Sequence, residues 1–298
     1  MINRPLCHIS DNKINKLPNK TYKMLLACSP DRAHQTHTIT EMQKILSKNF
    51  KVTNFSIFDA LYKFGRVKTQ EKIFSMISNF DVFMIWLSKP ALDFNFYKKL
   101  KKINPSITIV YFEGDSDVIF PIYSKRLVKD FDFFIALDSL DVADVVSQMG
   151  CKSICLGNVI SQKDFYHIQN TKKKYEVMFY GGLKFQGGSR QQILEFLKQK
   201  GIPIHCFGKS FGYISSKELN KKINQSKIVI SLNEVGFNPK TIKLPKNYKI
   251  STHIKSKIFE AILCKTFVLS EEIENMDRFF IPNKELVSFS NKLDLVTK

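Results

Sequence analysis

The sequence has no hydrophobic run long enough to cross a lipid bilayer. Its longest apolar runs, such as Val82 to Leu87, fall well short of the roughly 18 to 20 apolar residues that a membrane-spanning helix needs. The first twenty residues are rich in Asn, Lys and Pro and contain no apolar stretch of the kind that secretory signals have. We therefore expect a cytoplasmic protein whose contact with a membrane, if any, is peripheral.

Arginine is scarce for such a basic chain. The net charge is +19, yet only six of the 46 basic residues are arginines. Arginine contacts bases with two hydrogen bonds and stacks on them, whereas these lysines are scattered over both halves of the chain. The charge therefore favours attraction to anionic membrane surfaces or acidic acceptors over specific nucleic-acid recognition. A nucleic-acid-binding protein stays open as a less favoured alternative, and it would show steeply salt-dependent binding.

No pair of cysteines has C-x-x-C spacing. The six cysteines lie mostly in apolar, strand-like stretches, which is typical of reduced residues that pack in a core. We expect neither a disulfide framework nor a structural metal, and the sequence predicts no bound cofactor.

Apolar strand-like runs alternate with amphipathic segments along the first half of the chain. This alternation is typical of repeated β-α units around a parallel sheet. The expected strands are Tyr22–Ala27, Val52–Phe55, Asp81–Trp86, Ile107–Phe112, Phe131–Ala136 and Ser153–Leu156. The expected helices are His37–Leu46, Glu71–Ile77, Phe94–Ile103 and Leu140–Met149.

A second round of β-α units follows a polar, lysine-rich stretch at residues 161–174. Its expected strands are Glu176–Tyr180, Ile204–Phe207, Ile228–Leu232 and Phe267–Leu269, and its expected helices are Arg190–Gln199, Ser215–Gln225 and Ile254–Leu263. The sequence therefore predicts an α/β protein with two Rossmann-like domains in tandem. We place a polar extension at 1–20, the first domain at 21–160, a linker at 161–174 and the second domain at 175–298.

Open parallel sheets bind ligands at the carboxyl ends of their strands, and three strands of the second half end in glycine or polar residues. The residues at these ends are Gly181, Gly182 and Arg190 after the first strand, Gly208 and Lys209 after the second, and Asn233 and Glu234 after the third. Glycines let a backbone approach a phosphate, and the start of a helix offers free N–H groups to an anion. The segment matches neither a Walker loop nor G-x-G-x-x-G.

The helix expected at Ile254–Leu263 carries Lys255, Lys257 and Glu260. Glu260 falls among the apolar positions of that helix. Because an unpaired buried carboxylate is costly, Glu260 is expected either to bridge within the fold or to bind ligand hydroxyl groups.

The segment KSKIFEAILCKTFVL, from Lys255 to Leu269, resembles the C-terminal hallmark of the glycosyltransferase group 1 families. There a basic residue precedes F-E-A, a small-residue turn with glycine and an apolar strand; here the turn is Cys264-Lys265. The stretches YEVMFYGGLKFQGGSRQQILEFLKQKGIPIHCFGKS and SSKELNKKINQSKIVISLNEVGF are similar to the spore-maturation-protein-like branch. The resemblance covers roughly the last 125 residues.

The resemblance implies a GT-B fold with a central cleft between its domains. The C-terminal domain would hold the donor nucleotide-sugar, and the N-terminal domain would hold a glycan, lipid or protein acceptor. Glu260 would accept hydrogen bonds from ribose hydroxyls, and Lys255 and Lys257 would offset the diphosphate charge. Cations and helix dipoles that stabilise the leaving diphosphate would allow transfer without a metal. The expected activity is that of a hexosyltransferase-type enzyme.

An inverting transfer needs a general base from the N-terminal half, and the candidates are Asp115 and His34. Both follow expected strands in loops rich in titratable side chains. Asp115-Ser116-Asp117 is also a D-x-D triplet, the metal-binding signature of the other main glycosyltransferase architecture. A metal-dependent transferase is therefore one alternative, and a non-catalytic nucleotide- or sugar-binding protein of the same fold is another.

Overall fold

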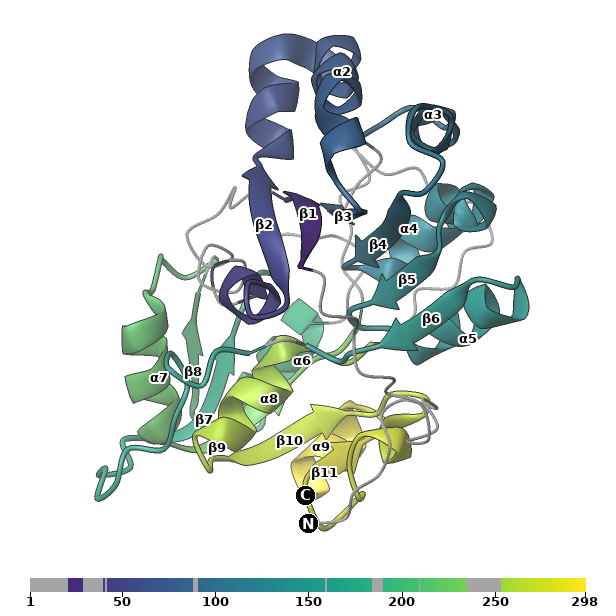
Figure 1. The fold of residues 1–298 in the computed structure, drawn as a ribbon. Coiled ribbons are helices and arrows are strands. Elements are labelled where there is room, and N and C mark those ends of the chain that lie inside the picture. The colour runs from purple at the N-terminus through teal and green to yellow at the C-terminus, as the bar shows by residue number, and fades with distance from the viewer. Residues whose placement is uncertain are drawn as a thin grey trace. The chain divides into compact units, whose positions relative to one another are not determined.

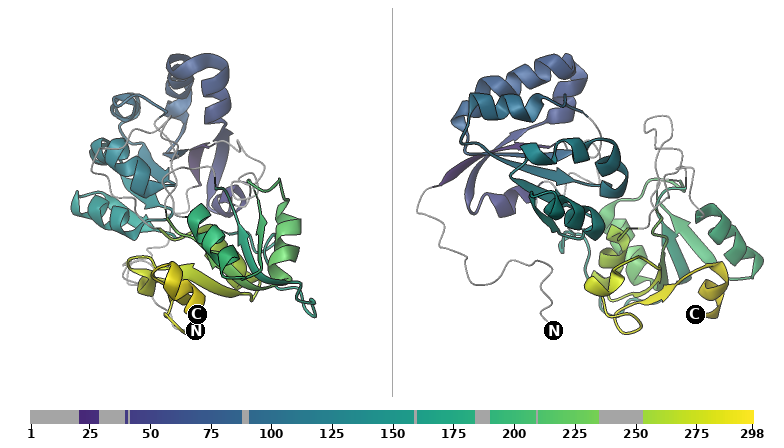
Figure 2. Two further views of the ribbon diagram at one scale, coloured as in Figure 1. Left: turned by 180° about the vertical axis from the view of Figure 1, so that it is seen from behind. Right: turned by 90° about the vertical axis from the view of Figure 1, so that its right-hand side faces the viewer.

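The chain forms two compact units, Met1–Leu156 (unit 1) and Gly157–Lys298 (unit 2). The structure is a computed structural model that describes residues 21–28, 40, 42–87, 91–158, 160–183, 190–208, 210–234 and 253–298. Each unit is a parallel β-sheet with helices packed against it (Figures 1 and 2). Within these residues, no helix combines the length and the apolar character needed to cross a bilayer.

The sheet of unit 1 has six strands in the order β2-β1-β3-β4-β5-β6, and all its described pairs are parallel. Its strands are β1 (Tyr22–Ala27), β2 (Phe50–Phe55), β3 (Val82–Leu87), β4 (Thr108–Glu113), β5 (Phe133–Ala136) and β6 (Lys152–Cys155). Apolar residues fill β1, β3 and β4 because helices cover both faces of the sheet. The strand order reverses between β1 and β3.

Unit 1 has helices between nearly all of its strands. They are α2 (Ile57–Met76), α3 (Phe96–Ile103), α4 (Ser116–Ile122) and α5 (Leu140–Gln148), with short 3₁₀ turns at η2 (Ile77–Asn79), η3 (Ser124–Arg126) and η4 (Val128–Asp130). Helical residues 42–46 contribute Met42 to the core cluster that contains Met24, Met84 and Phe112. The ring of Phe96 in α3 packs on Phe83 of β3 with 5.9 Å between ring centroids.

The sheet of unit 2 has five parallel strands in the order β11-β10-β9-β7-β8. Its strands are β7 (Tyr175–Tyr180), β8 (Ile204–Phe207), β9 (Ser226–Ser231), β10 (Phe267–Glu271) and β11 (Val287–Phe289). Its helices are α6 (Arg190–Gln199), α7 (Ser216–Asn224), α8 (Ser256–Leu263) and α9 (Lys292–Thr297), with a 3₁₀ turn at η5 (Met276–Arg278). The strand order reverses between β7 and β9.

Alternate side chains of β7 enter two different cores, as the two-residue period of a strand requires. Met178 and Tyr180 pack with Ile223 of α7 and Ile258 of α8 on one face. Phe179 packs on the other face in a cluster with apolar residues of α6 and α9, which include Leu194, Leu197 and Leu295. Helices therefore pack on both faces of β7, an inner strand of the sheet, and hold its carboxyl end in place.

The predicted α/β class with two Rossmann-like domains in tandem is confirmed. Predicted strands and helices coincide with observed elements to within about two residues at most ends. Three differences stand out. The helix predicted at Glu71–Ile77 is the end of the longer α2, the helix predicted at His37–Leu46 lies partly outside the described residues, and α4, β11 and α9 were not predicted.

The stretch at residues 161–174 packs against α7 through several hydrogen bonds, two of which run from its backbone N–H groups to asparagine side chains of α7. Tyr166 N donates to Asn220 Oδ1 at 3.1 Å, and Ile168 N donates to Asn224 Oδ1 at 2.7 Å. The predicted domain limits and the predicted cleft between the domains stay predictions.

Helix α8 ends in a Schellman motif at the turn where the resembled families have glycine. Lys265 adopts φ +54°, and Thr266 N donates to Ala261 O at 3.0 Å. Lysine thus occupies the left-handed position that glycine favours. The hydrogen bonds of this motif close the turn between α8 and β10 with lysine at that position.

Candidate functional site

The carboxyl ends of β7 and β9 form the point in unit 2 where the strand order reverses. These two strands are neighbours in the sheet, although α6, β8 and α7 lie between them in sequence. Such a point leaves room beside the strand ends, because the following connections run to opposite faces of the sheet. Gly181 and Gly182 follow β7, and Asn233 and Glu234 follow β9, so the sequence-predicted residues meet at this edge.

Two glycines bring the ends of β7 and β8 into close backbone contact. Gly181 N donates to Phe207 O at 3.0 Å. Gly208 has φ +98°, and a Cβ atom there would lie 2.9 Å from Gly181 N. Both the backbone conformation and the contact therefore require glycine at position 208.

We expect Gly208→Ala to destabilise unit 2 more than Gly212→Ala. Gly212 also has a positive φ, +111°, but a Cβ atom there meets nothing within 4 Å. The positive φ lowers the free energy of unfolding by about 1–3 kcal/mol in either alanine variant. Only Gly208→Ala loses about 1–3 kcal/mol more through the clash. Urea unfolding followed by far-UV circular dichroism measures both, and equal losses would contradict the close contact.

Arg190, the first residue of α6, joins the two strand ends. Its Nη1 donates to Gly182 O at 3.2 Å, and its Nη2 donates to Glu234 O at 2.7 Å. One guanidinium group therefore connects the ends of β7 and β9 at the point where the strand order reverses. It also brings a permanent positive charge to the start of a helix, where backbone N–H groups already favour an anion.

Asn233 is fully buried and fixes the end of β9 against β10. Its side-chain amide donates to Ser270 Oγ at 2.7 Å, and its oxygen accepts from Ser231 Oγ at 2.6 Å. The Glu271 carboxylate accepts from the backbone N–H groups of Asn233 and Glu234 at 2.6 and 3.0 Å. Asn233 thus holds the strand end in place, and its side chain is occupied within the fold.

Lys257 is a buried cation in the first turns of α8. Its side chain is only 7% exposed, and its Nζ donates to Tyr180 O at 3.0 Å and lies 4.6 Å from the centre of the Phe179 ring. Burial lowers the pKa of Lys257 well below its usual value, and the charges of Arg190 and Lys255 lower it further. These three cations therefore share one region at the carboxyl end of β7.

Glu260 lies one turn further along α8 and is tied to the same strand. Tyr180 donates from its hydroxyl to Glu260 Oε2 at 2.8 Å. Burial raises the pKa of Glu260, while hydrogen bonds from Tyr180 and Ser256 and the charge of Lys257 oppose that shift. The expected partner for this carboxylate thus exists within the fold, and a carboxylate that accepts one bond from Tyr180 keeps sites for further donors.

Lys255 occupies the N-cap position of α8, and its side chain pairs with a neighbouring histidine. Its Nζ forms a hydrogen bond with Nε2 of His253, and His253 N donates to Asn233 O at 3.2 Å. This chain of contacts fixes the start of α8 to the end of β9. The edge therefore presents three cations and one carboxylate, a set that can compensate an anion and accept hydrogen bonds from hydroxyl groups.

Residues 190–298 match a family model described as "Glycosyl transferase-like". The matched residues begin at Arg190 and include α8 with Lys255, Lys257 and Glu260. This part of unit 2 is therefore similar to glycosyltransferases. The resemblance to glycosyltransferases that the sequence indicated is thereby confirmed, and the spore-maturation-protein-like branch stays a prediction.

Two solved structures are similar to this chain at low sequence identity. One is described as "Glycosylation Associate Protein (Gap123) complex from Streptococcus agalactiae", with 10% identity, a TM-score of 0.47, and coverage of 80% of this chain and 53% of that chain. The other is the "Glycotransferase of kitacinnamycin", with 9% identity, a TM-score of 0.41, and coverage of 86% and 82%. The chain thus spans about half the length of the first. No curated protein sequence matches significantly.

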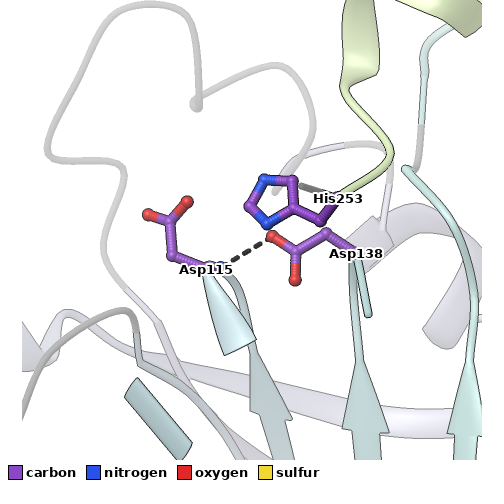
Figure 3. A group of neighbouring side chains, drawn as sticks. All are labelled: Asp115, Asp138 and His253. Carbon is purple, nitrogen blue, oxygen red and sulfur yellow. Dashed lines mark hydrogen bonds between the residues drawn. The ribbon is translucent and has the colours of Figure 1, made fainter. Parts of the chain in front are cut away.

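Outside the matched residues, Asp115 of unit 1 follows β4 in a left-handed conformation with φ +54°. Its backbone N donates to Asp138 Oδ2 at 2.8 Å, and Ser116 N donates to Asp138 Oδ1 at 3.1 Å (Figure 3). Asp138 therefore caps the start of α4 and leaves the exposed Asp115 carboxylate pointing away from its own backbone. Asp117, the other acid of the D-x-D triplet, accepts from Ser139 Oγ at 2.8 Å.

Two predicted site residues, His34 and Lys209, lie outside the described residues. Two residues that organise the site of unit 2, Tyr180 and Glu271, were not predicted, and neither was Asp138, which holds the loop of Asp115 in unit 1. Each follows or ends a strand, and the polar residue at a strand end is the sequence signal that could have found them.

Proposed function

We propose that the protein is a glycosyltransferase that transfers a sugar from a nucleotide-sugar to an acceptor without a metal ion. The observation that carries this proposal is the Arg190 guanidinium, which bridges the ends of β7 and β9 beside the buried Lys257. A diphosphate between a nucleoside and a sugar is the anion that suits such an edge. Hexose is the proposed sugar class, and a glycan, a lipid or a protein is the proposed acceptor.

The three cations would bind the diphosphate and stabilise it as the leaving group. When the bond from the sugar to the diphosphate breaks, negative charge builds up on the departing phosphate oxygen. Arg190, Lys255 and Lys257 would meet that charge in a partly buried site, where positioned cations stabilise it more than water does. Gly181, Gly182 and Gly208 would let the phosphates approach the backbone, and Lys209 would add a fourth cation.

Glu260 would bind the ribose through its remaining acceptor sites. Tyr180 holds one oxygen of this carboxylate, so the side chain is already oriented before a ligand arrives. Asn233 would keep the end of β9 rigid, and Glu234 would lie beside the donor. Preorganised acceptors lower the entropic cost of binding a sugar hydroxyl group.

The acceptor would lie against unit 1, with Asp115 or His34 as general base. Asp115 is exposed on the loop after β4, where a carboxylate can reach the proton of an acceptor hydroxyl. The proposed location is the cytoplasm, with peripheral contact with a membrane where the acceptor is a lipid.

A screen of nucleotide-sugars tests the proposed function. Wild type and Glu260→Gln are incubated with UDP-, GDP-, ADP- and dTDP-sugars, each with and without EDTA, and thermal stability and release of nucleoside diphosphate are followed. We expect one nucleotide class to stabilise the wild type and to be hydrolysed slowly, with no effect of EDTA. Glu260→Gln should bind about tenfold more weakly, because it loses a charged acceptor for the ribose.

The exposed Glu195→Gln serves as the matched control and should behave like the wild type. Stabilisation without any release of nucleoside diphosphate would favour a non-catalytic binding protein. A response that EDTA abolishes would contradict metal independence and would make Asp115 and Asp117 candidate metal ligands. No response to any nucleotide-sugar would overturn the proposal.

A further inference from the structure

Helix α2 bends into two rods at a single residue. Gly65 has φ +74° and ψ 172°, far from helical values, while the residues on either side remain helical. The two rods run side by side and are joined at the end farthest from the strands of unit 1 (Figures 1 and 2). We refer to residues 61–68, around this bend, as the α2 tip.

The α2 tip combines exposed apolar and basic side chains. Tyr62 is 97% exposed and Val67 is 64% exposed, which is unusual for large hydrophobic residues. Lys63, Arg66 and Lys68 are exposed between and beside them. No acidic residue occurs from position 60 to position 70, so the charged side chains of the α2 tip itself are all basic.

Contacts below the bend hold the α2 tip in this shape. Thr69 donates from Oγ1 to Gly65 O at 2.7 Å, and Arg66 pairs with Asp93 at 3.1 Å. The ammonium group of Lys72 lies 3.5 Å from the centre of the Phe64 ring. Phe64 therefore packs within the hairpin, and Tyr62 and Val67 are left as the outward apolar side chains.

We propose that the α2 tip docks on an anionic lipid surface. Tyrosine favours the boundary between lipid headgroups and acyl chains, where its ring is buried and its hydroxyl stays in water. The basic side chains beside the tyrosine attract acidic headgroups, whose negative charge complements the positive charge of the α2 tip. A protruding bend offers no groove for a peptide, and the apolar side chains between the cations contribute nothing to phosphate contacts along a nucleic acid. A lipid surface can contact both the apolar and the basic side chains of the α2 tip.

Vesicle co-sedimentation tests the proposal, which is independent of the proposed transferase activity. The full chain is mixed with vesicles of phosphatidylcholine alone or with added phosphatidylglycerol, at low and high salt. We expect binding to the anionic vesicles only, weakened by salt. Lys63→Gln/Lys68→Gln should lower the partition coefficient about 30-fold, and Tyr62→Ala/Val67→Ala about tenfold.

Matched controls lie on unit 2. Tyr213→Ala removes another exposed aromatic ring, 79% exposed, and Lys217→Gln/Lys221→Gln removes the same charge from the exposed side of α7. Both should bind vesicles like the wild type. Equal losses in the tip and control variants would overturn the proposal, since binding would then follow net charge alone. Tip-dependent binding to DNA or RNA oligonucleotides in the absence of vesicle binding would overturn it as well.

Discussion

Lys257→Met is expected to lower the affinity for a nucleoside diphosphate about 100-fold while leaving the stability of the free protein within about 1 kcal/mol of the wild type. Burying the lysine in unit 2 costs free energy, and its Nζ recovers part of that cost through the bond to Tyr180 O. Methionine has a similar length and no charge to desolvate. If Lys257 binds an anion as proposed, its removal should therefore weaken ligand binding far more than it weakens the fold.

The same substitution should abolish a proton uptake that accompanies binding. Burial, with Arg190 and Lys255 nearby, lowers the pKa of Lys257, and a bound diphosphate would raise that pKa again. At pH values between the pKa of Lys257 in the free protein and its higher pKa in the complex, binding is accompanied by proton uptake. The affinity therefore falls as the pH rises through the pKa of the free protein. Calorimetric titrations in buffers of different ionisation enthalpy measure this uptake.

Lys265→Met is the matched control, since Lys265 is exposed at the other end of α8. It should retain both the affinity and the proton uptake of the wild type. If Lys265→Met and Lys257→Met weakened binding equally, the diphosphate would not lie at the carboxyl end of β7.

Glu113→Gln is expected to remove a loss of stability that unit 1 of the wild type shows as the pH rises. The Glu113 side chain is fully buried at the end of β4, and neither of its oxygens has a hydrogen-bond partner among the described residues. Burial raises its pKa well above the usual value, and the charges of Asp138 and Asp115 add to the rise. The nearby hydroxyls of Ser124 and Tyr111 oppose the shift without meeting hydrogen-bond geometry.

The sign of the effect follows from which state holds the proton. In the unfolded chain Glu113 ionises near pH 4.3, about its reference value, while in the folded chain it keeps its proton to higher pH. The folded state therefore binds more protons, and stability falls as the pH rises from the unfolded pKa to the folded pKa. The loss is at most about 1.4 kcal/mol per pH unit. Glutamine is neutral throughout and avoids it.

Urea unfolding at a series of pH values, followed by tryptophan fluorescence, measures this difference. Trp86 is the one tryptophan of the chain and belongs to β3, so its signal reports on unit 1. Glu71→Gln, which changes an exposed acid on α2, should follow the wild type. Identical pH profiles for the wild type and Glu113→Gln would show that Glu113 is not held protonated by the fold.

Much of the fold could be predicted because its signals are local. Apolar runs such as those of β3 and β9 identify buried strands without knowledge of their neighbours. The first half of α2 was missed because Gly65, with its non-helical backbone, interrupts the helical period there. Helix α4 was missed because it follows an aspartate turn and contains Pro121.

The candidate site was predictable only in part, for a related reason. Glycines and cations at strand ends are visible one segment at a time, and parallel topology brings those ends together. The contacts that fix them are long-range, such as Tyr180 with Glu260, which are 80 positions apart, and Asn233 with Glu271, which are 38 apart. Sequence periodicity carries no information about such pairs.

The most direct test of the proposed donor site is a calorimetric titration of the wild type with UDP, GDP, ADP and dTDP, each compared with its nucleoside. We predict that one nucleoside diphosphate binds, with or without EDTA, and that its nucleoside binds at least about 100-fold more weakly, because the phosphates meet Arg190, Lys255 and Lys257. A nucleoside that binds as tightly as its diphosphate, or no binding by any of the four diphosphates, would contradict a diphosphate site at the ends of β7 and β9.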